Sequence, residues 1–117
     1  MFITPTKARM LVLFFDESDT WGAPPIPLYQ AIVQLLIAEG ISGATVLRGI
    51  MGYGAAHQLH EMDAANFSTD RPVTILAVDL EDRLRAAMEK IAPMVEEGMG
   101  FLMDGEILHH GAGVPGA

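Results

Sequence analysis

Cysteine is absent from this 117-residue chain, so disulfide bridges, thiolate zinc sites and cysteine nucleophiles are excluded together. Basic residues are scarce as well, since 7 Lys and Arg stand against 15 Asp and Glu and the formal net charge is −8. Proteins that bind the nucleic-acid backbone need clustered cations to release its counterions. We therefore expect no nucleic-acid partner.

Long apolar runs are missing too. The runs at residues 10–15 and 32–38 fall far short of the roughly 20 residues that a membrane-spanning helix requires, and Pro5 and Lys7 interrupt any signal-peptide pattern. The sequence thus predicts a soluble, cytoplasmic protein. Half of the residues are nevertheless hydrophobic and the mean hydropathy is +0.31, which favours burial of apolar surface between subunits.

The first half of the chain predicts a strand, a loop and a helix. Residues 10–15 are continuously apolar, which is typical of a strand covered on both faces. Three prolines and a glycine within residues 21–27 predict a loop without regular structure. Apolar residues at helical spacing then predict a helix from Pro27 to Glu39, closed by Gly40 as a left-handed cap with Ile41 folding back on it.

The second half predicts two strands, a helix and a further strand region. The strands are expected at residues 43–51 and 73–79, joined by a connection of about twenty residues (52–71) of a length that is usually functional or disordered. An amphipathic helix is expected over residues 80–95, kinked at Pro93. One or two short strands around a turn at Asp104-Gly105 follow, and residues 111–117 are expected to be a flexible tail.

This order predicts the α+β class, as a single ferredoxin-like domain over residues 1–110. The βαββαβ pattern forms a two-layer sandwich with an antiparallel sheet and both helices on one face. Because the first strand is apolar on both sides, we expect the bare sheet face to pack against sister subunits in a closed ring, a trimer.

The segment Gly43–Gly54 is the candidate ligand site. Its strand pattern ends at Arg48, whose planar guanidinium suits a phosphate or carboxylate. Gly49, Gly52 and Gly54 follow at close spacing and permit close approach of a ligand or positive-φ turns, and Tyr53 among them could stack on a base. Alternatives remain open at this point. The glycines can equally relieve crowding where the strand bends, and Tyr53 can anchor packing.

Arg48 also has a structural alternative, namely a salt bridge to Glu17, Asp19 or Asp79 across a subunit boundary. Two further kinds of site compete with the anion site. His57, His60 and Glu61 have a metal-ligand spacing, although a solvated polar loop explains them as well. The acidic turn at residues 16–19 together with His60 suggests general acid or base chemistry, but acidic turns before helices also arise from capping.

Several segments together resemble a family called domain of unknown function 190 (DUF190), which is similar to the PII signalling and CutA proteins. The resemblance covers roughly Arg9–Ile107, and its most specific block is Gly43–Gly54. The other segments that carry it are Glu17-Ser18-Asp19, Pro27-Leu28-Tyr29, His60, Ser68-Thr69-Asp70, Pro72 and Val78-Asp79.

The resemblance implies a homotrimer with a mobile loop between the second and third strands. In PII proteins an adenine nucleotide binds between subunits near the base of this loop, and the loop reports ligand state to a transporter or enzyme. Members of the family are often encoded beside fluoride-exporter genes, which implies a membrane transporter as partner. A basic, glycine-rich second phosphate loop is missing here, so the ATP and 2-oxoglutarate chemistry of PII is not carried over.

The combined interpretation is a non-enzymatic PII-like regulator that binds a small anionic metabolite, an adenine nucleotide, in the cleft between subunits. The first rival is a CutA-type metal-binding trimer. The second is a small enzyme, for which no motif names a reaction.

Overall fold

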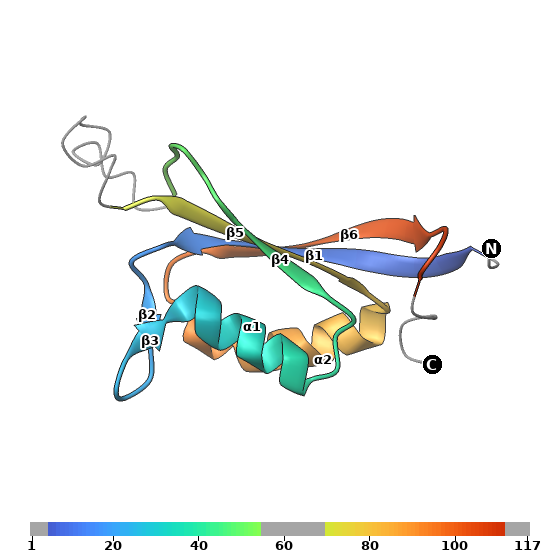
Figure 1. The fold of residues 1–117 in the computed structure, drawn as a ribbon, viewed down its shortest axis with the longest axis horizontal. Coiled ribbons are helices and arrows are strands. Elements are labelled where there is room, and N and C mark those ends of the chain that lie inside the picture. The colour runs from blue at the N-terminus through green and yellow to red at the C-terminus, as the bar shows by residue number, and fades with distance from the viewer. Residues whose placement is uncertain (1–4, 55–69, 112–117) are drawn as a thin grey trace.

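The computed structural model describes residues 5–54 and 70–111. An antiparallel sheet in the order β4-β5-β1-β6 carries both helices on one face (Figure 1). The strands are β1 (Thr6–Asp16), β4 (Ala44–Arg48), β5 (Pro72–Asp79) and β6 (Met99–Ile107), and the helices are α1 (Leu28–Ala38) and α2 (Glu81–Ile91). This is the ferredoxin-like βαββαβ arrangement that the sequence predicts.

The core lies between the sheet and the two helices. In β5 every second residue is buried, as expected for a strand with one face against the helices. The residues of this core include Leu11, Leu13 and Phe15 of β1, Val73 and Ile75 of β5, Leu28, Ile32 and Leu36 of α1, and Leu84, Ala87 and Ile91 of α2. Burial of these apolar side chains is the main favourable contribution to folding.

The predicted ends of α1 are confirmed. Pro27 precedes the first helical residue with φ −55°, and Gly40 adopts the left-handed conformation at φ +76°. The N–H of Gly40 donates to the carbonyl of Ile37 at 3.0 Å, and the N–H of Ile41 donates to that of Leu36 at 3.0 Å. These two bonds satisfy carbonyls that the end of a helix otherwise leaves without partners.

The segment of residues 21–27 differs from its prediction, because it contains a small hairpin. β2 (Thr20–Trp21) and β3 (Ile26–Pro27) pair antiparallel. Gly22, at φ +91°, adopts a backbone conformation that other residues rarely tolerate and turns the chain back. The prolines between the two strands occupy the connection, so their missing N–H groups cost no ladder bond.

Two features of the second half were also predicted wrongly. The Asp104-Gly105 pair forms no turn, because β6 runs unbroken beside β1 as far as the Thr6–Ile107 pair, with Arg9 Nη1 lying 2.7 Å from Asp104 Oδ1 across the ladder. Pro93 does not kink a long helix. Instead α2 ends at Ile91 and the 3-10 turn η2 (Ala92–Met94) contains the proline, which has no N–H for an α-helical bond.

Asp79 is fully buried at the end of β5. Its carboxylate accepts hydrogen bonds from the N–H of Ser42 at 2.9 Å and of Leu80 at 2.6 Å, and Arg83 Nε lies 3.0 Å from Oδ1. Arg83 also donates to the carbonyl of Gly40. A buried carboxylate is tolerated only with such partners, so Asp79 joins the end of α1, the start of β4 and the start of α2.

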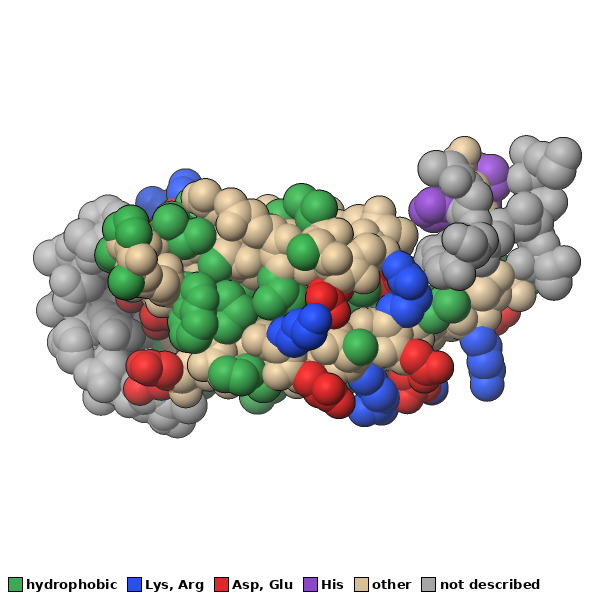
Figure 2. Space-filling model, turned by 90° about the horizontal axis from the view of Figure 1, so that it is seen from below, with side chains coloured by type: hydrophobic (Ala, Val, Ile, Leu, Met, Phe, Trp, Pro, Cys, Tyr) green, Lys and Arg blue, Asp and Glu red, His purple; other side chains and the backbone are tan. Residues whose placement is uncertain are grey.

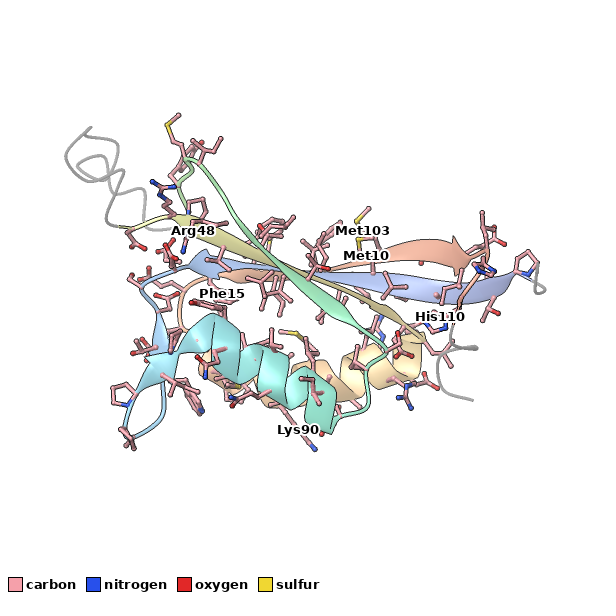
Figure 3. The ribbon with its side chains drawn as sticks, in the orientation of Figure 1. Met10, Phe15, Arg48, Lys90, Met103 and His110 are labelled. Atoms are coloured by element: carbon pink, nitrogen blue, oxygen red, sulfur yellow. The ribbon has the colours of Figure 1, made fainter. Side chains whose placement is uncertain are left out.

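The sheet face opposite the helices, called the open face below, is apolar. It comprises Met10, Val12 and Phe14 of β1, Leu76 and Val78 of β5, Leu47 of β4, and Met99, Phe101 and Met103 of β6, which the strand register places on one side. Figure 3 shows Met10 and Met103 pointing away from the helices, whereas Phe15 points toward α1. Phe14 is 43% exposed and Phe101 51%. The apolar run of β1 predicts a strand that is covered on both faces. Within a single chain, only its face toward the helices is covered.

The helix side of the molecule carries ion pairs instead. Lys90 Nζ lies 2.7 Å from Glu39 Oε2, and Arg85 Nε lies 2.6 Å from Glu81 Oε2. Figure 2 shows acidic and basic side chains lying next to one another on this face. Among the helices in the described part of the chain, none has the length and apolar character to cross a membrane. The helix side thus mixes charged and apolar side chains, whereas the open face is apolar.

Candidate functional site

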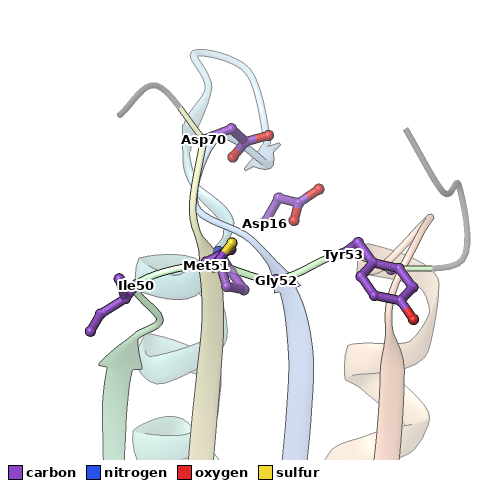
Figure 4. Close-up of a pocket in the computed structure, with 8 residues that line it drawn as sticks. Asp16, Ile50, Met51, Gly52, Tyr53 and Asp70 are labelled. Carbon is purple, nitrogen blue, oxygen red and sulfur yellow. The ribbon is translucent and has the colours of Figure 1, made fainter. Parts of the chain in front are cut away.

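The predicted ligand residues gather at the end of the sheet where β1 and β4 finish and β5 begins. A hollow of about 20 Å³ lies there, between the segment that leaves β4 and the start of β5. It is lined by Asp16, Ile50, Met51, Gly52, Tyr53, Gly54, Asp70 and Pro72. In Figure 4, Asp16 and Asp70 lie on the same side of the Met51-Gly52 segment. The structure therefore brings the glycine segment together with two carboxylates.

Arg48, the last residue of β4, forms an ion pair with Glu17, the first residue after β1. The pair spans the start of β5, which lies between β1 and β4 in the sheet. Its side chains are 59% exposed for Arg48 and 27% for Glu17. Glu17 is one of the three partners that the sequence suggests for Arg48. The ion pair forms within one chain, whereas the sequence-based prediction places it across a subunit boundary.

Gly49 and Gly52 are glycines because Pro72 lies against them. An added Cβ at Gly49 would lie 2.6 Å from Pro72 Cγ, and one at Gly52 would lie 3.1 Å from the same atom. The N–H of Gly49 donates to the carbonyl of Pro72 at 2.7 Å. Neither residue, nor Gly54, has a positive φ, so the crowding explanation applies to the first two, and the positive-φ turns that would line a phosphate are not formed.

Replacing Gly49 by alanine is expected to destabilise the fold by about 1–3 kcal/mol, because the new Cβ must push β4 away from a rigid proline ring. Gly54→Ala is the matched control, since no atom of the described residues lies within 4 Å of its added Cβ. Urea denaturation of both variants measures the difference. Equal stabilities would contradict this account of Gly49.

Tyr53 lines the hollow and is 69% exposed. Its ring is thus accessible at the rim of the site, and Figure 4 shows it projecting along the segment beyond Gly52. Base stacking by Tyr53 stays a prediction.

The turn after β1 is strongly acidic. Asp19 accepts a hydrogen bond from the N–H of Asp16 at 3.1 Å, and Asp70 accepts one from the N–H of Ser18 at 3.3 Å. Burial raises the pKa of the Asp19 carboxyl, and repulsion from neighbouring carboxylates, Asp70 foremost, adds to the rise. The ordinary pKa of an aspartate is 3.8, so the raised pKa means that ionisation of Asp19 is less favourable in the folded protein than in the unfolded chain. Ionised Asp19 therefore lowers the free energy of unfolding at neutral pH, and this loss of stability disappears once the pH falls below 3.8.

Asp19→Asn is accordingly expected to raise the melting temperature slightly at about pH 7, with a smaller difference at about pH 4. The amide oxygen keeps the hydrogen bond from Asp16 while the charge is removed. Thermal unfolding of the two proteins at both pH values measures this difference. A variant that melts below the wild type at neutral pH would contradict the interpretation.

The two rival sites are the metal site and the acid–base site, and the structure describes only part of their residues. His57, His60 and Glu61 lie outside the described residues, so the metal site stays a prediction. Within residues 5–54 and 70–111, no group of three or more His, Cys, Asp and Glu side chains is placed to hold a metal ion. The acidic turn at residues 16–19 is described, but its proposed partner His60 is not.

A larger hollow of about 460 Å³ lies elsewhere, along the groove between α2 and β6. Leu84, Met88 and Ala92 form its helix side, and Gly100 and Leu102 its strand side, with Arg85 and Glu89 also lining it. None of the predicted site residues lines it. The groove meets the open face at Phe101.

Asp16, Asp70 and Pro72 line the hollow but were not predicted from the sequence as parts of the candidate ligand site. Asp16 and Asp70 stand directly beside strand ends in the sequence, which is where strand order brings side chains together, and this signal could have placed them. The contact of Pro72 with Gly49 depends on the register of β4 against β5.

Comparisons with known proteins agree with this fold. Residues 8–107 match the family DUF190, described as an uncharacterized ACR. UPF0166 protein MJ1524 of Methanocaldococcus jannaschii is 34% identical over 90 residues, which cover 77% of this chain and 81% of that protein. A UPF0166 protein of Aquifex aeolicus is 25% identical over 103 residues, covering 88% and 95%.

Among solved structures, CPII of Thiomonas intermedia K12 is a nitrogen regulatory PII-like protein bound to ADP, AMP and bicarbonate. It is similar to this chain with a TM-score of 0.65 and 19% identity, over 92% of this chain and 93% of that chain. At this identity the likeness shows the fold alone. The family match over residues 8–107 and the 34% identity to the Methanocaldococcus jannaschii protein show the family as well. The chain belongs to the DUF190 family and has its PII-like, ferredoxin-like fold.

Proposed function

We propose that the protein is a non-enzymatic PII-like regulator that binds a small anionic metabolite, an adenine nucleotide, in the cleft between subunits of a homotrimer. Arg48 meets the phosphate, Gly52 and Gly54 border the ligand, and Tyr53 covers the base. The loop of residues 52–71 reports ligand state to a membrane transporter such as a fluoride exporter.

The observation that carries the proposal is the position of Arg48. It presents a half-exposed guanidinium at the end of the sheet, beside the glycine segment and an accessible tyrosine ring. An arginine fork in such a place suits an oxyanion. The fold supports the ligand class, because CPII shares it and is described as bound to ADP and AMP.

The size of the hollow supports a site shared between subunits. Ligand pockets usually enclose about 300–1,000 Å³, whereas the described residues of one chain enclose about 20 Å³ here. A nucleotide therefore needs walls beyond the described residues, and in the proposal a second subunit supplies them.

The open face supports the trimer. It is a broad apolar surface on a chain whose other face mixes charged and apolar side chains, and such surfaces mark contacts between proteins. A closed ring in which each sheet turns this face inward removes it from water.

Thermal-shift titration tests the function. The purified protein is titrated with AMP, ADP, ATP, cyclic AMP and divalent metal ions, alongside Arg48→Ala. A nucleotide at about 100 times its Kd should stabilise the native state by roughly 2.7 kcal/mol, and the shift should vanish in the variant. A shift with metal ions alone would support the CutA-type rival instead, and turnover of the added nucleotide would support an enzyme.

A further inference from the structure

The ion pair between Glu17 and Arg48 occupies the arginine that the proposed function assigns to the anion. Glu17 sits at the turn after β1, and its N–H donates to the carbonyl of Arg71 at 2.8 Å. This bond anchors the Glu17 backbone beside the start of β5, while its carboxylate reaches Arg48 at the end of β4. The pair is thus built from the ends of three strands.

The charges around the pair are unfavourable for an anion. The basic residues at this end of the sheet are Arg48 and Arg71. The acidic residues there are Asp16, Glu17, Asp19 and Asp70, and Glu96 and Glu97 lie close enough to repel Asp19. Only the Glu17 carboxylate is in direct contact with Arg48 among the ion pairs of the described residues. Asp70 lines the hollow but accepts its hydrogen bond from Ser18.

We propose that Glu17 is an internal competitor for the oxyanion of the ligand and so sets the affinity and selectivity of the site. The inference rests on the proposed function. A phosphate or carboxylate that reaches Arg48 either displaces Glu17 or shares the guanidinium with it. In the second case the two negative charges lie close together and repel each other. Because Arg48 is exposed and Glu17 is partly exposed, displacing Glu17 costs little, and the ligand affinity is reduced rather than abolished.

Isothermal titration calorimetry with AMP on Glu17→Gln tests this role. Glutamine keeps the length of the side chain and removes its charge. The variant is expected to bind AMP about two- to fivefold more tightly than the wild type. This range corresponds to the free energy of a surface ion pair that the ligand no longer has to break. Adenosine, which lacks the phosphate, should bind both proteins equally.

Asp70→Asn is the matched control, because it removes one negative charge from the same end of the sheet without touching Arg48. Its amide oxygen can still accept the hydrogen bond from Ser18. It should change AMP affinity less than Glu17→Gln does. In an Arg48→Ala background, in which AMP binding is lost, Glu17→Gln should restore none of it, as expected for a residue that acts only through its direct partner. The melting temperature of each variant without nucleotide verifies that it folds.

The outcomes separate the two proposals. If the wild type binds AMP and Glu17→Gln binds it equally or more weakly, the competitor role is overturned and the proposed function stands. Equal gains in Glu17→Gln and Asp70→Asn would also overturn it, because general electrostatics would then explain both. If neither the wild type nor Glu17→Gln binds AMP, both proposals fail.

Discussion

Phe101→Lys is expected to convert the proposed trimer into monomers of 12.6 kDa. Phe101 lies on the open face, in register with Val12 and between Met99 and Met103. In a closed ring each of the three copies would place an ammonium group in an apolar interface without a counter-ion, and burying an unpaired charge costs several kcal/mol. Size-exclusion chromatography with light scattering measures the mass directly.

The control for this variant is Ile37→Lys. Ile37 is also a large apolar residue and is 71% exposed, but it belongs to α1 on the helix side. That variant should keep the mass of the wild type. A trimer that survives Phe101→Lys, or one that dissociates with Ile37→Lys, would contradict the assignment of the open face to the subunit interface.

Asp79→Ala is expected to lower the free energy of unfolding by about 3–5 kcal/mol, a large share of the roughly 5–15 kcal/mol of an ordinary domain. The substitution leaves the N–H groups of Ser42 and Leu80 without their acceptor and Arg83 without its carboxylate. Buried donors without partners cost their full desolvation. Urea denaturation followed by circular dichroism measures the loss.

Asp82→Ala provides the comparison for Asp79. Asp82 is exposed in the first turn of α2, so its charge interacts mainly with the helix dipole, and its removal should cost about 0.3–1 kcal/mol. Similar losses in the two variants would mean that the bonds to Asp79 do not hold the ends of α1, β4 and α2 together.

Most of the fold can be predicted from local signals. The runs and spacing of apolar residues locate both helices, three strands of the main sheet and the region of the fourth. Pro27 and Gly40 fix the ends of α1 because their backbone preferences are intrinsic. The β2–β3 hairpin escapes prediction because its prolines dominate the composition of the segment. β6 runs unbroken through Asp104-Gly105 because it pairs with β1. Pairing with a strand so distant in the sequence cannot be recognised from the local residue pattern.

The candidate site is only partly predictable for the same reason. The arginine and glycines stand out in the sequence, but the contact of Gly49 with Pro72 and the choice of Glu17 as partner of Arg48 depend on strand order. Asp79 illustrates the limit most clearly. It stands at the end of a predicted strand, where an exposed residue is the ordinary expectation, and only the packing of Ser42 and Arg83 around it explains its complete burial.

Native mass spectrometry of the protein with AMP and ADP tests the central claim most directly, because it reads assembly and ligand occupancy in one experiment. The account predicts ions of three chains that carry nucleotide, and monomers of Phe101→Lys that carry none, since the proposed cleft takes its walls from two subunits. Nucleotide bound to the monomeric variant, or wild-type trimers without nucleotide at saturating concentration, would contradict a ligand site between subunits.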